Sequence, residues 1–231
     1  DVRDARRRGL HLAHLERLAR EGAQARLVGV GPPGTRPSHT TLVTGVAPDR
    51  HGIAHDQPFD PLGRSGDGGY WYAEDIRVPT LWDAARGRGL SAASVDWPVT
   101  VGAEISYNIA EYRRADAPGA PDSAKLARAM STKGLLAEAE RSLGPHPAGF
   151  ACAIEDDERR AEFAAYLLER KQPRLLLCYF CSLDQARHGG DPERAQVSSV
   201  LERLDAVVGR LRAAAERAGD GQAMVAVVSD H

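Results

Sequence analysis

The chain has 231 residues, enough for one α/β domain with a sizeable buried core, and its formal net charge is only −2. A balance this close to neutral argues against a nucleic-acid backbone or an acidic membrane surface as a partner. No apolar run approaches the roughly 20 residues of a transmembrane helix. The three cysteines are an odd number, which argues against a disulfide framework, and we expect them to be buried apolar side chains.

Hydrophobic periodicity predicts helices that alternate with short apolar strands. The helical patterns cover residues 4–22, 79–88, 123–143, 157–171 and 193–218. The apolar runs typical of buried strands cover residues 25–30, 90–95, 175–180 and 223–228. The run at 175–180 is too continuous for a surface strand, so we place it centrally in a parallel sheet. This alternation predicts an α/β fold with a mostly parallel sheet, in a single domain over residues 1–231.

Two irregular stretches interrupt the alternation. Residues 45–79 begin with a long segment rich in Gly, Pro and Asp, and loops of this length in compact domains are usually functional or act as lids. We expect Tyr70-Trp71-Tyr72 to pack under this lid-like segment. Residues 100–121 also read as irregular, with prolines acting as breakers near their end.

A turn rich in Gly and Pro follows the apolar run at 25–30 and leads into a short helical pattern. The free amides and the dipole at the start of such a helix favour anions such as phosphate. A hydroxyl in this position is a common nucleophile. Four side chains are rival candidates for the reactive oxygen, namely Thr35, Ser38, Thr40 and Thr41.

Carboxylates and imidazoles follow two of the predicted strands. Asp184 and His188 are four residues apart, so on a helical turn they share a face and can hold one cation. Asp230 and His231 follow the run at 223–228. Such sets suit Zn²⁺, and Mn²⁺ less well. Sites in parallel sheets form beyond the carboxyl ends of the strands, where two cations about 4 Å apart can clamp the oxygens of a phosphoryl displacement.

Taken in order, these motifs resemble the nucleotide pyrophosphatase/phosphodiesterase family of the alkaline phosphatase superfamily. The resemblance rests on Thr35-x-Pro37-x-His39, Thr44-Gly45, Pro48, His51-Gly52-Ile53, Phe59-Asp60-Pro61, Trp97-Pro98, Asp184-x-x-x-His188-x-Gly190 and Ser229-Asp230-His231. It implies an alkaline-phosphatase-like domain with helices on both faces of the sheet. It also implies that Thr35 is the nucleophile and that two zinc ions are bound.

The resemblance assigns the ligands of both ions. One ion would be held by Asp184 and His188 with a histidine downstream of the last residue. The other would be held by Asp230, His231, the Thr35 oxygen and an aspartate that matches Asp1, although Val2 stands where the family has Gly. The abrupt start and end of the sequence predict a fragment truncated at both ends. Members of the family are often periplasmic or secreted, and the Arg- and Ala-rich composition is typical of a GC-rich bacterial genome.

Two substrate-binding positions depart from the family pattern. The family has an Asn that donates a hydrogen bond to a phosphoryl oxygen, whereas this chain has Asp56 there. An ionised Asp cannot donate and repels phosphate. The residue after the nucleophile is commonly an aromatic that stacks on a nucleobase, whereas here it is Arg36, which can stack by its guanidinium plane or grip a phosphate or carboxylate. Both departures argue against the preference for nucleotides that the resemblance implies.

The leading interpretation is a zinc-dependent hydrolase of phosphodiester or pyrophosphate bonds in a small phosphorylated substrate, acting through a phospho-threonine on Thr35. The alternatives are a phosphonate or phosphomonoester hydrolase of the same superfamily, and a non-catalytic remnant domain. The oligomeric state is left open. We expect His39 and His51 to support the turn by hydrogen bonding. The histidines expected at the surface are His11, His14 and His146.

Overall fold

The structure is a computed structural model that describes residues 5, 7–31, 33–62, 68–112, 122–147, 152–188 and 194–231. Asp1, the expected zinc ligand, and Gly190 of the family motif lie outside these residues. The strands are β1 (Ala92–Val95), β2 (Tyr107–Ile109) and β3 (Leu175–Cys178). The helical elements are α2 (Ala13–Glu21), α3 (Thr35–Thr44), α4 (Pro48–His51), η1 (Ala73–Asp75), α5 (Leu81–Arg86), α6 (Ser123–Met130), α7 (Leu135–Leu143), α8 (Ile154–Lys171), α9 (Ser182–His188) and α10 (Arg194–Ala218).

The described strands form one parallel sheet in the order β2-β1-β3. Ala93 of β1 pairs with Tyr107 on one side and with Leu176 on the other. All four residues of β1 are buried, whereas those of β3 are only half-buried. The prediction that the run at 175–180 is central is therefore wrong for the described sheet, because β1 is central and β3 lies at its edge.

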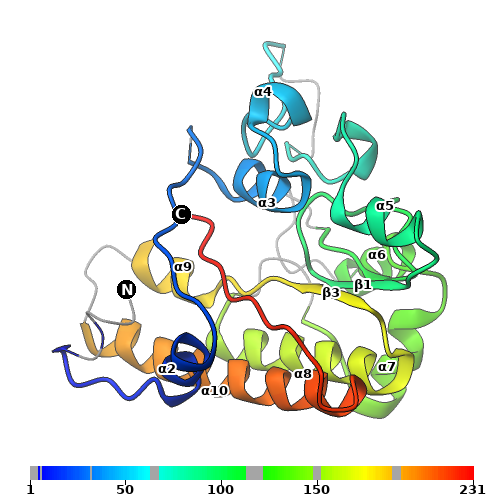
Figure 1. The fold of residues 1–231 in the computed structure, drawn as a ribbon. Coiled ribbons are helices and arrows are strands. Elements are labelled where there is room, and N and C mark those ends of the chain that lie inside the picture. Colours follow the sequence, from blue (N-terminus) through cyan, green and yellow to red (C-terminus); the bar gives the residue numbers. More distant parts are fainter. Residues whose placement is uncertain are drawn as a thin grey trace.

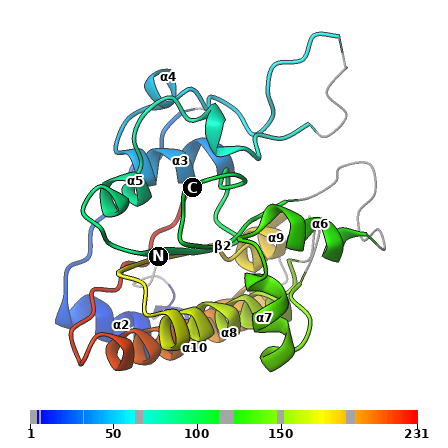
Figure 2. The same ribbon diagram turned by 90° about the vertical axis from the view of Figure 1, so that its right-hand side faces the viewer.

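Helices cover both faces of the sheet, as predicted (Figures 1 and 2). Successive side chains of a strand point to opposite faces, and β1 follows this rule. Ala93 and Val95 pack into the core that α7 and α8 cover, together with Phe163 and Leu167. Ala92 packs in the other core, whose members also include Val43 of α3 and Trp82 of α5. The fold is therefore α/β with a parallel sheet between two helical layers.

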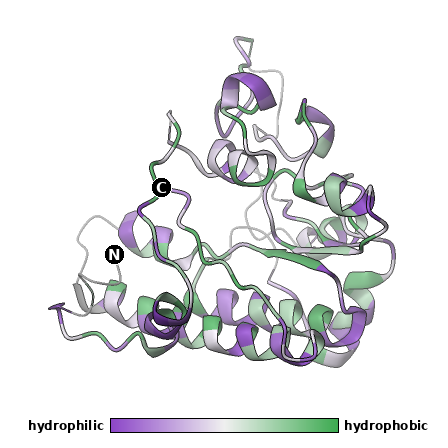
Figure 3. Ribbon diagram, viewed as in Figure 1, coloured by the Kyte–Doolittle hydropathy of each residue, from purple (hydrophilic) through white to green (hydrophobic). Residues whose placement is uncertain are grey.

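Figure 3 shows how hydropathy follows these layers. The strand β3 is coloured as hydrophobic, and the long helices α8 and α10 alternate hydrophobic with hydrophilic residues. This alternation is typical of helices with one face on a core and the other in solvent. Within the described part of the chain, we find no helix with both the length and the apolar character needed to cross a bilayer.

Local signals fix several helix ends. Thr80 and Asp83 form a capping box at the start of α5, with the Thr80 amide 3.0 Å from Asp83 Oδ2. The predicted helix over 123–143 is in fact two helices, because Gly134, with φ of +79°, separates α6 from α7. The predicted helix over 4–22 is interrupted, because Ala5 and Arg7 are helical, the chain turns at Gly9, and α2 begins only at Ala13.

The predicted strands at 25–30 and 223–228 are not present as strands. Both segments are extended and run side by side toward the start of α3 (Figure 1), and a Cβ on Gly29 would lie 4.0 Å from the Asp230 carbonyl oxygen. Neither makes a backbone ladder with another described segment. Their apolar side chains consequently face solvent, and Val28 is 84% exposed.

The described parts of residues 45–79 are held to the rest of the protein. The Ala73 amide donates to the Val101 carbonyl at 2.9 Å, and the Val101 amide donates to the Trp71 carbonyl at 3.0 Å. Trp71 is buried in a cluster with Val101, whereas Tyr72 is 41% exposed, so the structure buries Trp71 and leaves Tyr72 largely in solvent. A lid role for this segment stays a prediction.

The expectation of three unpaired cysteines is wrong. Cys152 forms a disulfide with Cys181, and only Cys178 is a free thiol. Burial raises the pKa of the Cys178 thiol well above its usual value, which keeps it protonated. An odd number of cysteines argues against a disulfide framework, although three cysteines still allow one bridge. The two partners are 29 residues apart, so no local motif marks them as a pair.

Candidate active site

Thr35 is the first residue of α3 and follows Gly34, whose backbone is extended. The first-turn amides of a helix have no partner inside the helix. Pro37 has no amide to satisfy, so it is tolerated in this turn. The Arg36 amide donates instead to Asp56 Oδ1 at 2.8 Å. A carboxylate 20 residues downstream thus caps the helix that carries the predicted nucleophile.

This cap depends on a close approach between Asp56 and Gly34. A Cβ at position 34 would lie 2.9 Å from Asp56 Oδ2. Glycine therefore leaves the space that the carboxylate occupies. Asp56 was expected to face the phosphoryl group, and in the structure it accepts a hydrogen bond from the turn that presents Thr35. A negative charge at this end of α3 is favourable because it meets the positive end of the helix dipole.

His39 supports the same turn from within the helix. Its Nδ1–H donates to the Thr35 carbonyl oxygen at 2.7 Å, and its ring makes edge contacts with Trp97 and Tyr179. Burial lowers the pKa of His39, while Asp230, whose Oδ2 lies 3.5 Å from Nδ1, opposes that shift. His39 is therefore a neutral structural donor that links Thr35 to Asp230.

His51 supports the helix further along. Its Nδ1 accepts a hydrogen bond from the Ile53 amide at 3.1 Å, so Nε2 carries the proton and donates to Thr41 Oγ1 at 3.0 Å. Burial lowers the pKa of His51 and favours this neutral form. The expectation that His39 and His51 act through hydrogen bonds is confirmed.

A cavity of about 150 Å³ opens beside the start of α3. Its lining residues are Thr35, Arg36, Glu111, Cys152, Tyr179, Cys181, Asp184 and Gln185. Several of them follow a strand end, as expected for parallel sheets, since Glu111 comes after β2 and Tyr179 after β3. The structure therefore brings Thr35, Arg36 and Asp184 of the predicted site together.

The cavity also distinguishes between the four hydroxyls of α3 that were candidates for the nucleophile. Ser38 and Thr40 are buried inside the protein, and Thr41 Oγ1 is hydrogen-bonded to His51. None of these three lines the cavity. Thr35 is consequently the α3 hydroxyl with access to a ligand at this position.

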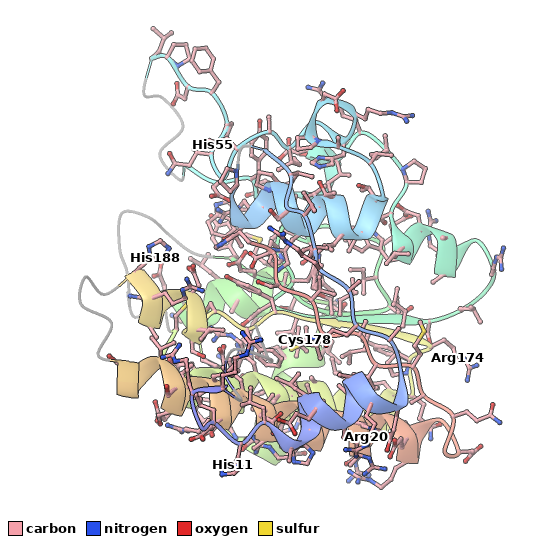
Figure 4. The ribbon with its side chains drawn as sticks, turned by 60° about the vertical axis from the view of Figure 1, so that its left-hand side comes forward. His11, Arg20, His55, Arg174, Cys178 and His188 are labelled. Carbon is pink, nitrogen blue, oxygen red and sulfur yellow. A yellow bond between two sulfur atoms is a disulfide. The ribbon has the colours of Figure 1, made fainter. Side chains whose placement is uncertain are left out.

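The side chains of each expected metal-ligand pair lie close together in the structure. His188 Nε2 lies 3.1 Å from Asp184 Oδ1 on one face of α9, and His231 Nε2 lies 3.4 Å from Asp230 Oδ2. Figure 4 shows His188 at the outer end of α9, where its side chain is 73% exposed. Carboxylate and imidazole donors fit Zn²⁺, which takes four ligands in a closed site. Among the described residues, no three His, Cys, Asp or Glu side chains gather around a common position for an ion.

A buried ionic network anchors the helix that carries Asp184. Arg160 Nε donates to Asp96 Oδ2 at 2.6 Å, and Nη1 donates to Asp157 Oδ1 at 2.8 Å. Asp157 in turn accepts the amides of Cys181 and Ser182 at 3.2 and 2.8 Å. The start of α9 is thus tied to α8 and to the end of β1.

Sequence reasoning missed several residues of the cavity, namely Glu111, Cys152, Tyr179 and Gln185. The rule that sites form at the carboxyl ends of parallel strands would have pointed to Glu111 and Tyr179. Glu111 was overlooked because β2, with three residues, was not recognised. Cys152 carried no such signal, because only the fold brings it to Cys181.

Known structures share this arrangement of sheet and helices. Phosphonoacetate hydrolase from Sinorhizobium meliloti, in complex with phosphonoformate, superposes with a TM-score of 0.67 at 19% identity, over 91% of this chain and 49% of that one. Murine ectonucleotide pyrophosphatase/phosphodiesterase 5 superposes with a TM-score of 0.57 at 19% identity, over 92% of this chain and 49% of that one. The fold is therefore alkaline-phosphatase-like.

The family follows from the sequence match. The family described as type I phosphodiesterase / nucleotide pyrophosphatase matches residues 3–231, and the chain belongs to it. An uncharacterized pyrophosphatase/phosphodiesterase of Schizosaccharomyces pombe is 25% identical over 210 residues, which are 85% of this chain and 35% of that protein. The chain thus spans about a third of this relative and about half of the similar solved structures.

Proposed function

We propose that this protein hydrolyses phosphodiester or pyrophosphate bonds of small phosphorylated substrates, with Thr35 as the nucleophile. The observation that carries the proposal is the position of Thr35 at the start of α3, where it lines a cavity together with Asp184. Membership of the type I phosphodiesterase / nucleotide pyrophosphatase family supports the same reaction class.

The charges of the cavity support a requirement for a cation. Glu111 and Asp184 line it with two carboxylates, against the single guanidinium of Arg36. A phosphoryl group entering beside two carboxylates meets repulsion unless positive charge is added. Zinc held by Asp184 and His188, and by Asp230 and His231, would supply that charge and acidify a nearby hydroxyl.

In the proposed reaction, the deprotonated Thr35 oxygen attacks phosphorus. The bond to the leaving group breaks, and its electron pair departs with the leaving oxygen. Water then attacks the phospho-threonine and returns the Thr35 hydroxyl with a free phosphate monoester or phosphonate. His39 holds the Thr35 carbonyl and thereby the orientation of the turn, while Asp56 holds the next amide.

The first prediction tests the nucleophile with p-nitrophenyl phenylphosphonate. Thr35→Ala should lower kcat by about 10³-fold or more, because no other α3 hydroxyl lines the cavity. Thr35→Ser keeps a hydroxyl and should retain measurable turnover. Acid quenching followed by mass spectrometry should find the phenylphosphonyl adduct on Thr35.

Ser38→Ala is the matched control, since Ser38 lies in the same turn and its buried hydroxyl has no hydrogen-bond partner among the described residues. It should keep kcat within about threefold of the parent, because the change removes no hydrogen bond to a described residue. Parent-like rates in Thr35→Ala would exclude the proposed nucleophile. Zinc content measured on the same samples separates an enzyme from a non-catalytic domain, because two zinc ions per chain would argue against a non-catalytic domain, whereas none or one would support it.

A further inference from the structure

The Arg36 side chain is held in one orientation beside Thr35, at the edge of the cavity. Its amide donates to Asp56 Oδ1, and its Nε–H donates to the Tyr70 carbonyl oxygen at 3.0 Å. Its guanidinium carbon lies 4.1 Å from the centroid of the Trp71 ring. A hydrogen bond at Nε and a stacking contact together fix both the position and the plane of the guanidinium.

The other edge of this guanidinium is available to a ligand. In the part of the chain that the structure describes, neither Nη1 nor Nη2 of Arg36 has a hydrogen-bond partner. These two nitrogens form a planar fork that matches the two oxygens of a carboxylate or phosphate group. Arg36 lines the same cavity as Thr35 and is the one cationic side chain among its described lining residues.

The aromatic ring beside Arg36 is not available for stacking. Trp71 is only 3% exposed, and Arg36 lies over its ring. A nucleobase therefore has no open Trp71 face to stack on next to the nucleophile. The cavity volume of about 150 Å³ also favours a compact ligand.

We propose that Arg36 binds a second anionic group of the substrate, a carboxylate or a phosphate-type oxyanion located close to the scissile phosphoryl group. The preferred substrate is then a compact molecule with two anionic groups, and Arg36 determines this specificity. The inference rests on the proposed hydrolysis at Thr35 and names the substrate class of that site.

The test compares three substrates that share one leaving group. They are the mono-p-nitrophenyl esters of ethylphosphonate, carboxymethylphosphonate and phosphonomethylphosphonate, in which only the second group changes. In the parent protein, kcat/KM should be higher for at least one of the two anionic esters than for the ethyl ester. In Arg36→Gln, that ratio should fall by about 10- to 100-fold, the range expected for losing charge-assisted hydrogen bonds.

The two anionic esters and two further variants sharpen the result. The ester preferred by the parent identifies carboxylate or phosphate as the recognised group. Arg36→Lys keeps the charge without the fork, so it should restore part of the ratio for the phosphonate and less for the carboxylate. Arg77→Gln removes an exposed arginine that does not line the cavity and should leave the ratios of the parent.

Equal losses on all three esters in Arg36→Gln would overturn the inference, because Arg36 would then act on the shared phosphonyl group. Unchanged ratios would also overturn it, while leaving hydrolysis at Thr35 intact. Calorimetric titration with methylenebisphosphonate and methylphosphonate gives an answer independent of turnover. The parent should bind the bisphosphonate more tightly and Arg36→Gln should lose that difference. If Arg36→Gln loses this difference in affinity but the parent shows no turnover, only the proposed hydrolysis is rejected. If Arg36→Gln keeps the difference in affinity, the inference about Arg36 is rejected.

Discussion

Three histidines of this chain are buried, and burial lowers the pKa of each. His39 makes a ring hydrogen bond to the turn that presents Thr35, and His51 makes two that support α3 and the chain after it. His146 was expected at the surface, but it is buried with its ring edge-on to Phe163, at 4.8 Å between centroids. Neither of its ring nitrogens has a hydrogen-bond partner among the described residues. The buried His146 ring therefore lowers the free energy of unfolding, and it lowers it further when the ring binds a proton.

We predict that His146→Leu makes the protein less sensitive to acid. The pKa of His146 is lowered in the folded state, so the unfolded chain binds the proton first and acid favours unfolding. The stability of the parent should be complete above about pH 6.5 and fall below it, by up to about 1.4 kcal/mol per pH unit for this one proton. Urea unfolding between pH 7.5 and pH 5 measures the slope.

The control for this prediction is His11→Leu, which removes an exposed histidine. It should keep the pH dependence of the parent, while His146→Leu shows a shallower curve. Parallel curves for the parent and His146→Leu would mean that the buried ring does not set the acid sensitivity. Asp96, whose Oδ2 is 3.6 Å from Nε2, partly offsets the effect of burial and limits the size of the change.

Among the helices, α8 holds the elements around the cavity in place through its side chains. Arg160 joins α8 to the end of β1 through Asp96 and, through Asp157, to the amides that begin α9. The Arg160 side chain is 1% exposed. Arg203 of α10 pairs with Glu155 and Glu158 of α8, yet its side chain is 36% exposed. The two arginines have similar partners in different environments.

We predict that Arg160→Met lowers the free energy of unfolding by about 3–5 kcal/mol, because it leaves two carboxylates buried without their cation. Arg203→Met should give a much smaller change, since water solvates the exposed glutamates once their partner is gone. The measurement is the urea midpoint of each variant at pH 7. Equal losses in the two variants would show that burial does not determine the strength of these pairs.

Sequence reasoning found the long, periodic helices and the short apolar run that contains β1. The helices α8 and α10 and the strand β1 were all predicted close to their observed bounds. The misses have local causes. The strand β2 is three residues long and shows no usable alternation, and the break between α6 and α7 depends on the positive φ of Gly134. The segments at 25–30 and 223–228 have strand composition, but the described sheet offers them no partner.

At the scale of the whole molecule, the Cys152–Cys181 disulfide joins the chain before α8 to the chain before α9. We predict that its loss lowers the free energy of unfolding by about 3–4 kcal/mol, the loop-closure entropy for a separation of 29 residues. Dithiothreitol should lower the urea midpoint of the parent by the corresponding amount. A Cys152→Ala/Cys181→Ala double variant should be insensitive to the reductant.

Cys178→Ala is the matched control for this experiment, because it removes the free thiol and keeps the bridge. Its unfolding should remain sensitive to dithiothreitol. Insensitivity of the parent would show that the bridge does not form in solution. Since both cysteines of the bridge line the cavity, the same samples also report how far the reduced protein retains turnover.

The composition of the site could be predicted only in part from the sequence. Motif order and strand ends pointed to Thr35, Arg36 and Asp184, and the structure places all three around one cavity. The role of Asp56 could not be predicted, because its partner is the Arg36 amide rather than a side chain with a sequence signature. The predicted ligand set for two zinc ions stays a proposal, with Asp1 outside the described residues.

The contact between Gly34 and Asp56 also constrains how this site can change over evolution. A side chain at position 34 would crowd the carboxylate that caps α3, so a substitution of Gly34 requires Asp56 to shift or to change with it. A lineage that replaces Gly34 therefore displaces the carboxylate from the Arg36 amide or exchanges residue 56 as well. Libraries that vary this end of α3 should consequently randomise positions 34 and 56 together.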